Sequence, residues 1–323
     1  MATGTQPKTL QQAIEYFADH DRCHAYAVAE RWPDGVVRCP QCGGTDVHYL
    51  STQRRWECKA KHPRRQFSLK VGTVMEDSAI PLKHWLLAMW MVANCKNGVS
   101  SYEIHRHVGV TQKSAWFLLH RIRLAMQAKD GGKLGGDVEI DETFIGAKAR
   151  NMHKDKKRRM LQGHRGGQIG KVAVMGLLQR TTKDGKSQVR LQTVRKVKRG
   201  DLVPHITKHV EPWGTTVFTD ALPSYDDLWK HDYVHQVIDH ATHYAEGNVH
   251  TNGMENFWSL LKRTLNGTYI SVEPFHLFRY LDEQAFRFNK RETTDGERFR
   301  AVLRSVIGRR VTYKQLTANT EAA

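Results

Sequence analysis

Three acidic residues have the types and surroundings that suit a catalytic metal site. Asp141 lies in a strand-like run, Asp220 closes a second strand-like run, and Glu255 lies in a helix-like run. Carboxylate oxygens are ligands that Mg²⁺ prefers, and bound metal ions catalyse displacement at phosphorus. Three converging carboxylates in an otherwise basic chain therefore indicate a magnesium site that acts on a phosphate backbone.

The two aspartates occupy different places in their predicted strands. Val138 and Ile140 alternate with Glu139 and Asp141, so the two acids share one strand face. A carboxylate at the centre of a strand is unfavourable unless a partner balances it, and either a metal or an arginine would serve. Asp220 ends its strand, at the edge where open α/β sheets usually place ligands.

Glu255 has two competing interpretations. Asn252 followed three residues later by a glutamate is a capping pattern, which would give Glu255 a structural role. On a helix, however, Glu255 and Lys262 lie two turns apart on one polar face, beside an apolar face. Together they could hold a metal and a DNA phosphate, and His250, just upstream, could orient a phosphate or a water.

Cysteine spacing predicts a second metal site, of the structural kind. Cys39 and Cys42 form a Cys-x2-Cys knuckle, and Cys58 and His62 form a second pair. Structural zinc takes four such ligands as two pairs, so we expect a zinc ribbon, which leaves no open position for catalysis. His62 is the least usual ligand, and His48 is its substitute. Three buried or free cysteines are the alternative.

The composition of the chain favours a polyanionic partner. Its 323 residues include 50 Lys and Arg against 33 Asp and Glu, a net charge of +17. Such an excess favours nucleic acid, although a soluble basic protein without this partner has the same composition. The length fits about two domains, and a hydrophobic content of 40 % is that of a globular chain.

Nothing in the sequence predicts export or a membrane span. No stretch approaches ~18 apolar residues, and residues 1–9 lack the apolar core of a signal peptide. Five cysteines, an odd number with three of them clustered, argue against a disulfide framework. We therefore expect a cytoplasmic, nucleoid-associated protein.

Two short helices form a helix-turn-helix candidate. Ser100 or Ser101 can cap the first helix, which ends near Gly109, and Thr111 can cap a second that runs to Met126. An ordinary helical hairpin has the same pattern. Four basic residues on the second helix favour DNA binding, namely Lys113, His120, Arg121 and Arg123.

The order of the other elements predicts an α/β fold, in which a mixed sheet is flanked by helices. A glycine-rich hinge precedes the sheet. From the N-terminus we expect helices over 9–32 and 82–95, the hinge at 130–136, strands over 137–146, 172–182 and 187–198, a helix over 201–211, strands over 215–220 and 233–238, and helices over 252–266, 275–290 and 295–308.

A basic segment follows the strand that carries Asp141. Residues 148–171 are dense in Lys, Arg and Gly. The segment could bind substrate phosphates or be a solvated loop, and its position after Asp141 favours the phosphates. Its most basic run is Lys156, Lys157, Arg158 and Arg159.

Together these motifs resemble the DDE transposases of bacterial insertion sequences, in the group with a zinc ribbon and an ISXO-type catalytic domain. The resemblance covers about residues 20 to 290, and the Cys-x3-His pair departs from it, because two cysteines are more usual there. The residues that carry it are Cys39-Pro40-Gln41-Cys42, Arg65-Gln66-Phe67-Ser68, Ile140-Asp141-Glu142-Thr143, Thr219-Asp220, His250-Thr251-Asn252, Glu255-Asn256-Phe257-Trp258-Ser259-Leu260-Leu261-Lys262-Arg263 and parts of 280–289.

With the elements above, the resemblance implies four regions. They are an N-terminal helical segment over 1–35, a zinc ribbon over 36–70, a helical DNA-binding region over 71–130, and a ribonuclease H-like catalytic domain with C-terminal helices over 131–323.

The resemblance also implies a transposase that cuts DNA at transposon ends and transfers the strands into target DNA, as a dimer. Asp141, Asp220 and Glu255 would hold Mg²⁺ or Mn²⁺ for two-metal phosphoryl transfer, with Lys262 as the following basic residue and with Zn²⁺ purely structural. Two alternatives remain, a nuclease without strand transfer and a non-enzymatic regulator derived from a transposase. Residues expected at DNA are Lys113, Arg121, Lys156, Lys157, Arg158, Arg159 and Arg263.

Overall fold

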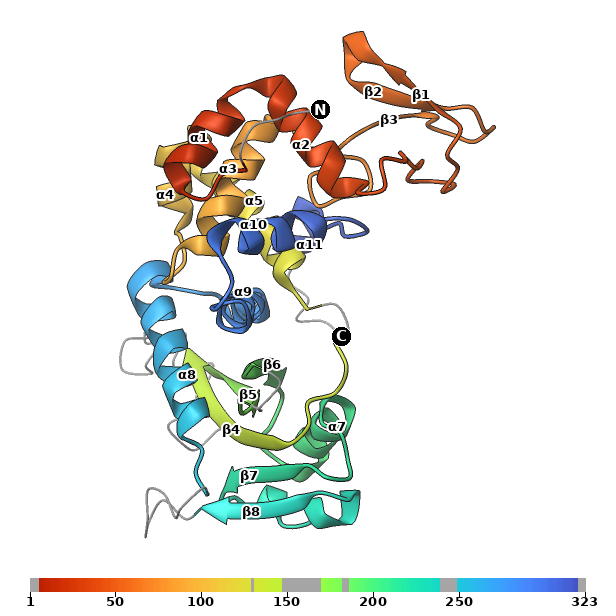
Figure 1. Ribbon diagram of the computed structural model, residues 1–323. Helices are drawn as coiled ribbons and strands as arrows, with labels where there is room; N and C mark the ends of the chain where they lie inside the picture. Colours follow the sequence, from red (N-terminus) through yellow and green to blue (C-terminus); the bar gives the residue numbers. More distant parts are fainter. Residues whose placement is uncertain (1–5, 129–130, 147–169, 182–185, 239–248, 319–323) are drawn as a thin grey trace. The chain divides into compact units, whose positions relative to one another are not determined.

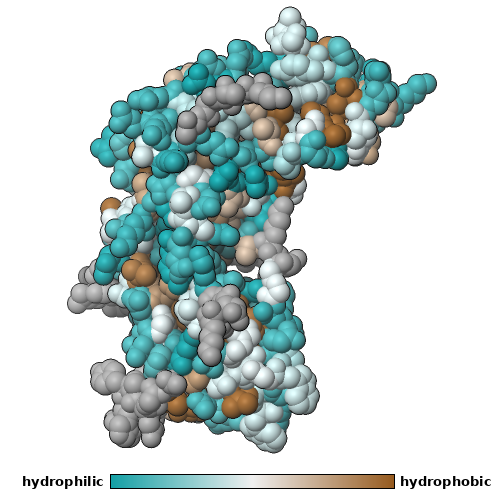
Figure 2. Space-filling view, in the orientation of Figure 1, coloured by the Kyte–Doolittle hydropathy of each residue, from teal (hydrophilic) through white to brown (hydrophobic). Residues whose placement is uncertain are grey.

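The chain folds into two compact units. The computed structural model (Figure 1) describes residues 6–128, 131–146, 170–181, 186–238 and 249–318. One unit comprises residues 1–127 together with 292–323, and the other comprises residues 128–291. Each unit is described by itself below. The face shown in Figure 2 is mostly hydrophilic, in keeping with the many charged residues of the sequence.

The first unit is mainly helical. The sequence predicted one helix over 9–32, but the structure divides this segment at Asp19, whose carboxylate accepts the Arg22 N–H (2.7 Å) and starts a second helix. No helix among the described residues is long and apolar enough to cross a membrane. The helices are α1 (Leu10–Ala18), α2 (His20–Arg31), α3 (Leu82–Asn94), α4 (Ser101–Val108), α5 (Gln112–Met126), α10 (Asp295–Arg304) and α11 (Tyr313–Thr317).

Helix α10 joins the first unit, whereas the sequence predicted that it would continue the catalytic domain. Phe299 of α10 packs on Trp90 of α3 and on Phe17 of α1, with ring centroids 5.2 Å and 5.6 Å apart. Arg304 adds an ion pair with Glu30 of α2 (2.7 Å). Burial of this apolar face against α1 and α3 explains the grouping.

Helices α4 and α5 form the two-helix unit that the sequence predicted. Ser100 and Glu103 make a complete capping box at α4, and Gly109 ends this helix in the left-handed conformation at φ 75°. Thr111 caps α5 by accepting the Ser114 N–H (3.2 Å). The turn between the helices therefore has the geometry that its residue types favour.

The basic residues of α5 do not form the surface that the sequence predicted. Arg121 is 4 % exposed; its guanidinium donates to the Glu76 carbonyl and lies 5.4 Å from the Trp85 ring. His120 and Arg123 are also buried. The expected DNA-binding role of Arg121 is therefore incompatible with its position. Lys113 remains exposed on this helix.

A small antiparallel sheet forms within the predicted ribbon. Its order is β1 (Val47–Leu50), β2 (Arg55–Cys58) and β3 (Gln66–Ser68), with η1 (Ser51–Gln53) between the first two strands. Trp56 and Phe67 stack on one face, with ring centroids 5.9 Å apart. Because so few of its side chains are buried, this sheet needs a source of stability besides its own hydrophobic core.

The second unit is built on a five-stranded mixed sheet. Its order is β6-β5-β4-β7-β8, in which β4, β5 and β6 are antiparallel neighbours, and β7 and β8 run parallel to β4. This confirms the predicted α/β class and fits the ribonuclease H-like arrangement. The strands are β4 (Asp137–Gly146), β5 (Lys171–Gln179), β6 (Gln188–Val194), β7 (Thr216–Asp220) and β8 (Val234–Ile238).

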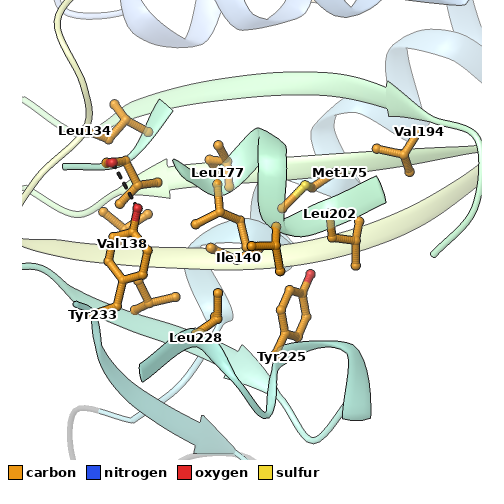
Figure 3. Close-up of a cluster of buried hydrophobic side chains, with 14 of the residues drawn as sticks. Leu134, Val138, Ile140, Met175, Leu177, Val194, Leu202, Tyr225, Leu228 and Tyr233 are labelled. Carbon is orange, nitrogen blue, oxygen red and sulfur yellow. Dashed lines mark hydrogen bonds between the residues drawn. The ribbon is translucent and has the colours of Figure 1, made fainter. Parts of the chain in front are cut away.

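Helices cover both faces of this sheet (Figure 1). Val138 and Ile140 of β4 enter one core with Leu202 of α7 (Figure 3). Val174 of β5 enters the other core with Leu261 of α8. The helical elements are α7 (Arg199–His209), η3 (Pro223–Tyr225), η4 (Leu228–His231), α8 (Asn252–Thr264), η5 (Leu265–Tyr269), η6 (Pro274–His276) and α9 (Leu277–Asn289).

Gly176 lets α8 approach the sheet closely. It lies opposite Asp141 in the β4–β5 pair. A Cβ atom at this position would come within 2.1 Å of Met254 Cε and 2.7 Å of Trp258 Cζ2. Both neighbours belong to α8, so a side chain here would displace the helix that carries Glu255.

Gly176→Ala should therefore destabilise the chain by about 1–3 kcal/mol, the usual cost of overpacking a core. Urea unfolding followed by circular dichroism measures this change. Gly200→Ala is the matched control, because a Cβ at Gly200 meets nothing within 4 Å. An alanine in helix α7 should even stabilise it slightly. Equal stability of the two variants would contradict the close approach of α8.

Candidate active site

Two neighbouring parallel strands bring Asp141 and Asp220 to the same edge of the sheet. Glu139 of β4 pairs with Phe218 of β7, and each aspartate follows two residues later on its own strand. Burial raises the pKa of Asp141 above its ordinary value, and the negative charges of Asp220 and Glu255 raise it further. Asp220 and Glu255 thus both lie close enough to Asp141 to act on its charge.

Glu255 reaches this cluster from α8, where it is exposed in the first turn. The structure does not form the capping arrangement that the sequence left open. Asn252 is the first helical residue rather than the cap, and the cap residue Thr251 makes no side-chain capping hydrogen bond. The buried carboxylate of Glu139 instead accepts the Met254 N–H at the start of the helix (2.8 Å).

The donor set of this cluster fits a divalent cation. Asp141 and Asp220 are partly buried and Glu255 is exposed, so the group is open to solvent on one side. Oxygen ligands of this kind suit Mg²⁺ or Mn²⁺. A cation there would also relieve the repulsion that raises the pKa of Asp141.

Both oxygens of Asp141 are held by protein donors. Oδ1 accepts the backbone N–H of Glu142 (2.8 Å), and Oδ2 accepts the indole N–H of Trp258 (2.9 Å). Trp258 lies one turn after Glu255 on α8. These two bonds fix the orientation of the carboxylate and tie β4 to the helix.

The arginine partner that the sequence left open belongs to Glu139 rather than to Asp141. Glu139 is 1 % exposed, and the Arg180 Nε lies 2.8 Å from its Oε1. Arg180 also donates to the His250 carbonyl (2.7 Å) and lies 4.0 Å from the Phe218 ring centroid. His250 was expected to orient a phosphate or a water, but its Nδ1 faces Arg180 (3.0 Å).

Glu142 is a further acid at the site, to which the sequence assigned no role of its own. Tyr225 donates its hydroxyl hydrogen bond to the Glu142 carboxylate. Burial raises the pKa of Glu142 to about 8, and the charges of Asp141 and Asp220 contribute to this rise. Without a metal this carboxyl is therefore protonated at neutral pH. Its only sequence signal is its place beside Asp141.

The metal-free chain should lose stability as the pH rises through this range. The unfolded chain releases the Glu142 proton near its ordinary value of 4.5, whereas the folded chain keeps it to about 8. The stabilisation is complete below about pH 4.5 and is lost as the pH rises through about 8. In EDTA, the melting temperature of Glu142→Gln should fall less steeply with rising pH than that of the wild type. Plots of melting temperature against pH that run parallel for the two proteins would contradict the raised pKa of Glu142.

The predicted DNA-contacting residues lie in different places. Lys262 and Arg263 are exposed on α8, on the helix that carries Glu255, and Lys113 is exposed on α5. Arg121 is buried, as shown above. Lys156, Lys157, Arg158 and Arg159 lie outside the residues that the structure describes.

A separate cluster near the N-terminus has the geometry of a structural zinc site. The ligand atoms of Cys39, Cys42, Cys58 and His62 all lie within 4.8 Å of one another. The Cys42 and Cys58 sulfurs are 3.7 Å apart, close to the ~3.8 Å that two Zn–S bonds of ~2.3 Å give in a tetrahedron. This supports a structural zinc, with His62 in the cluster rather than His48.

Comparison with known proteins agrees with this arrangement. Residues 133–289 match the ISXO2-like transposase domain, and residues 18–61 match the transposase zinc-ribbon domain. An uncharacterized transposase-like protein of Haemophilus influenzae is 36 % identical over 107 residues, which are 33 % of this chain and 85 % of that protein. The chain belongs to the ISXO2-like transposase family. The domain match includes all three carboxylates, and the zinc-ribbon match ends one residue before His62.

Two further likenesses are more distant. An uncharacterized protein in transposable element ISH50 of Halobacterium salinarum is 27 % identical over 264 residues, 78 % of this transposase and 85 % of that protein. A chain in the structure of the simian T-cell lymphotropic virus intasome with PP2A regulatory subunit B56 gamma aligns at a TM-score of 0.28 and 11 % identity. That alignment covers 60 % of this chain and 66 % of that one, just under two thirds. A likeness of this size carries no argument.

Proposed function

We propose that this member of the transposase family cuts DNA at the ends of a mobile element and joins the cut strands to target DNA. The observation that carries the proposal is that Asp220 of β7 and Glu255 of α8 both contribute to the raised pKa of Asp141 on β4. Two further negative charges therefore act on a carboxylate that is already partly buried. Such an arrangement is costly unless a cation binds there.

In this proposal the three carboxylates hold catalytic Mg²⁺. Bound Mg²⁺ would activate a water or a DNA 3′-hydroxyl and would stabilise the leaving oxygen. The chain supplies the fixed ligands, because Trp258 and the Glu142 backbone N–H hold the two oxygens of Asp141. Preorganised ligands cost little reorganisation during reaction.

DNA is the proposed partner of the exposed basic side chains. Lys262 and Arg263 would bind backbone phosphates beside the carboxylates, since both are exposed on α8. The net charge of +17 would strengthen this contact at any sequence. The zinc ribbon and the α4–α5 pair would hold the ends of the element, and a dimer of chains would pair the two ends.

A DNA cleavage assay tests this proposal. Purified chain is incubated with duplex DNA that carries the ends of the element, with Mg²⁺ or with EDTA. We expect cuts at the ends with Mg²⁺ only, and none with Asp220→Asn. Cleavage that persists in EDTA, or that is unchanged in Asp220→Asn, would show that these carboxylates take no part in the reaction. A chain that binds these ends without cutting them would favour the alternative function, that of a non-enzymatic regulator.

A further inference from the structure

Two acidic side chains of β4 hold the start of α8. Glu139 Oε2 accepts the Met254 N–H (2.8 Å), and Asp141 Oδ2 accepts the Trp258 indole N–H (2.9 Å). The two acids are two residues apart on β4, and their donors belong to residues four apart on α8. The two hydrogen bonds therefore tie the start of the helix to the strand at two points.

Two glycines make this contact possible. A Cβ atom at Gly253 would lie 2.7 Å from Glu139 Oε2, and one at Gly176 would lie 2.7 Å from Trp258 Cζ2. Real Cβ atoms do not approach neighbours so closely. Side chains at these positions would therefore push the helix away from the sheet, and both hydrogen bonds would lengthen.

Glu139 is not suited to bind the metal itself. Its side chain is only 1 % exposed, whereas Asp141 is partly exposed, and its charge is already paired with Arg180. Oε1 accepts from Arg180 (2.8 Å), and Oε2 accepts from the helix. A buried carboxylate paired in this way acts on the site through the helix that it caps.

We propose that Trp258 and Glu139 are positioning residues, which set α8 on β4 so that Glu255 meets Asp141 at the metal site. The inference rests on the proposed function, because it assigns the metal to these carboxylates. Glu255 lies between Met254 and Trp258 in sequence, so the two bonds enclose it on the helix. Partners of this kind, which orient a ligand without binding the metal, typically change metal affinity 10–100-fold.

The test is Mn²⁺ binding to the full chain, measured by titration calorimetry. Trp258→Phe keeps an aromatic ring against Gly176 but removes the N–H donor. We expect its Mn²⁺ affinity to fall about 10–100-fold, while circular dichroism shows that the chain is still folded and its DNA affinity is nearly unchanged. Trp229→Phe is the matched control, since Trp229 is 64 % exposed in the same unit. It should leave the affinity unchanged.

Glu139 is tested by a pair of variants. Glu139→Gln keeps an oxygen that can accept the Met254 N–H, whereas Glu139→Ala keeps none. We expect Glu139→Ala to lower Mn²⁺ affinity clearly more than Glu139→Gln does. Equal losses in the two variants would show that the ion pair with Arg180, rather than the capping bond, is what matters, and would overturn the positioning role of Glu139.

A further measurement leaves Trp258 in place, in case its replacement unfolds the chain. The chain has eight tryptophans, and their indole N–H groups give separate proton resonances. We expect Asp141→Ala to move one of these resonances strongly, because the acceptor of the Trp258 bond is lost. Indole resonances that are all unmoved would overturn the inference.

The outcomes separate this inference from the proposed function. If Trp258→Phe binds Mn²⁺ within twofold of the wild type, the positioning role of Trp258 is wrong, while cleavage by the wild type can still stand. If the wild type binds Mn²⁺ through Asp141 but cuts no DNA, the proposed function fails, while a weakened Trp258→Phe still supports the inference. A wild type without Asp141-dependent Mn²⁺ binding would overturn both.

Discussion

Glu255→Gln should reduce DNA cleavage and joining at least 100-fold, equivalent to about 3 kcal/mol of transition-state stabilisation. A glutamine keeps the size of the side chain and can still accept a hydrogen bond, but it has no negative charge for a divalent cation. Because Glu255 is exposed and the cap of α8 is supplied by Glu139, the fold should tolerate this change. Cleavage rates with Mg²⁺ measure the effect, and circular dichroism checks the fold.

Two companion variants make this experiment decisive. Asp141→Asn should be as inactive as Glu255→Gln, because both lose a ligand charge. Glu273→Gln makes the same chemical change at an exposed position of the same unit and should keep full activity. Mn²⁺ could restore part of the activity of the ligand variants, since it accepts softer ligands than Mg²⁺ does. If Glu255→Gln keeps most of the wild-type activity, Glu255 is not a ligand of the catalytic metal.

Removal of zinc should unfold the ribbon around Cys39, Cys42, Cys58 and His62. The small sheet in this region buries few large side chains, among them Trp56 and Phe67, so its own core contributes little stability. Structural zinc typically contributes about 10–16 kcal/mol of apparent binding free energy in such modules. Metal analysis should find about one zinc per chain, and Cys58→Ser should lose it together with protection from proteolysis.

The fourth zinc ligand has a control within the same ribbon. His62 Nε2 lies 3.5 Å from the Cys39 sulfur, whereas His48 is exposed on β1 and outside the cluster. His62→Ala should therefore weaken zinc retention during dialysis against a chelator, and His48→Ala should not. Equal retention by the two variants would contradict the assignment of His62. The second unit should stay folded in both cases.

Much of the fold followed from local patterns in the sequence. Alternating and apolar runs located the strands of the mixed sheet, and caps such as Ser100 and Thr111 located α4 and α5. Errors arose where a local signal was ambiguous. Asp19 divides a segment that was predicted as one helix, because an aspartate can cap a helix as well as lie within one. Helix α10 was predicted as part of the catalytic domain, whereas it groups with the first unit, because an apolar helix face does not reveal which surface it will pack against.

Several contacts of the candidate site could not be predicted from the sequence. The spacing of the ligands predicted the zinc cluster, and residue types suggested the three carboxylates. The bond from Trp258 to Asp141 was not predicted, because a tryptophan in an apolar stripe has the pattern of a core residue. Arg180 gave no signal either, as its contact with Glu139 depends on strand register. The burial of Arg121 depends on how helices pack, which its charge does not reveal.

The most direct measurement of the proposed function is strand joining in vitro. DNA that ends in the 3′-hydroxyl of a cut element end is incubated with a supercoiled plasmid, Mg²⁺ and the purified chain. The proposal predicts plasmid molecules joined to the end DNA, with no such product from Asp220→Asn or in EDTA. Cutting of DNA by the wild type without any joined product would contradict the proposed strand transfer and would favour a nuclease.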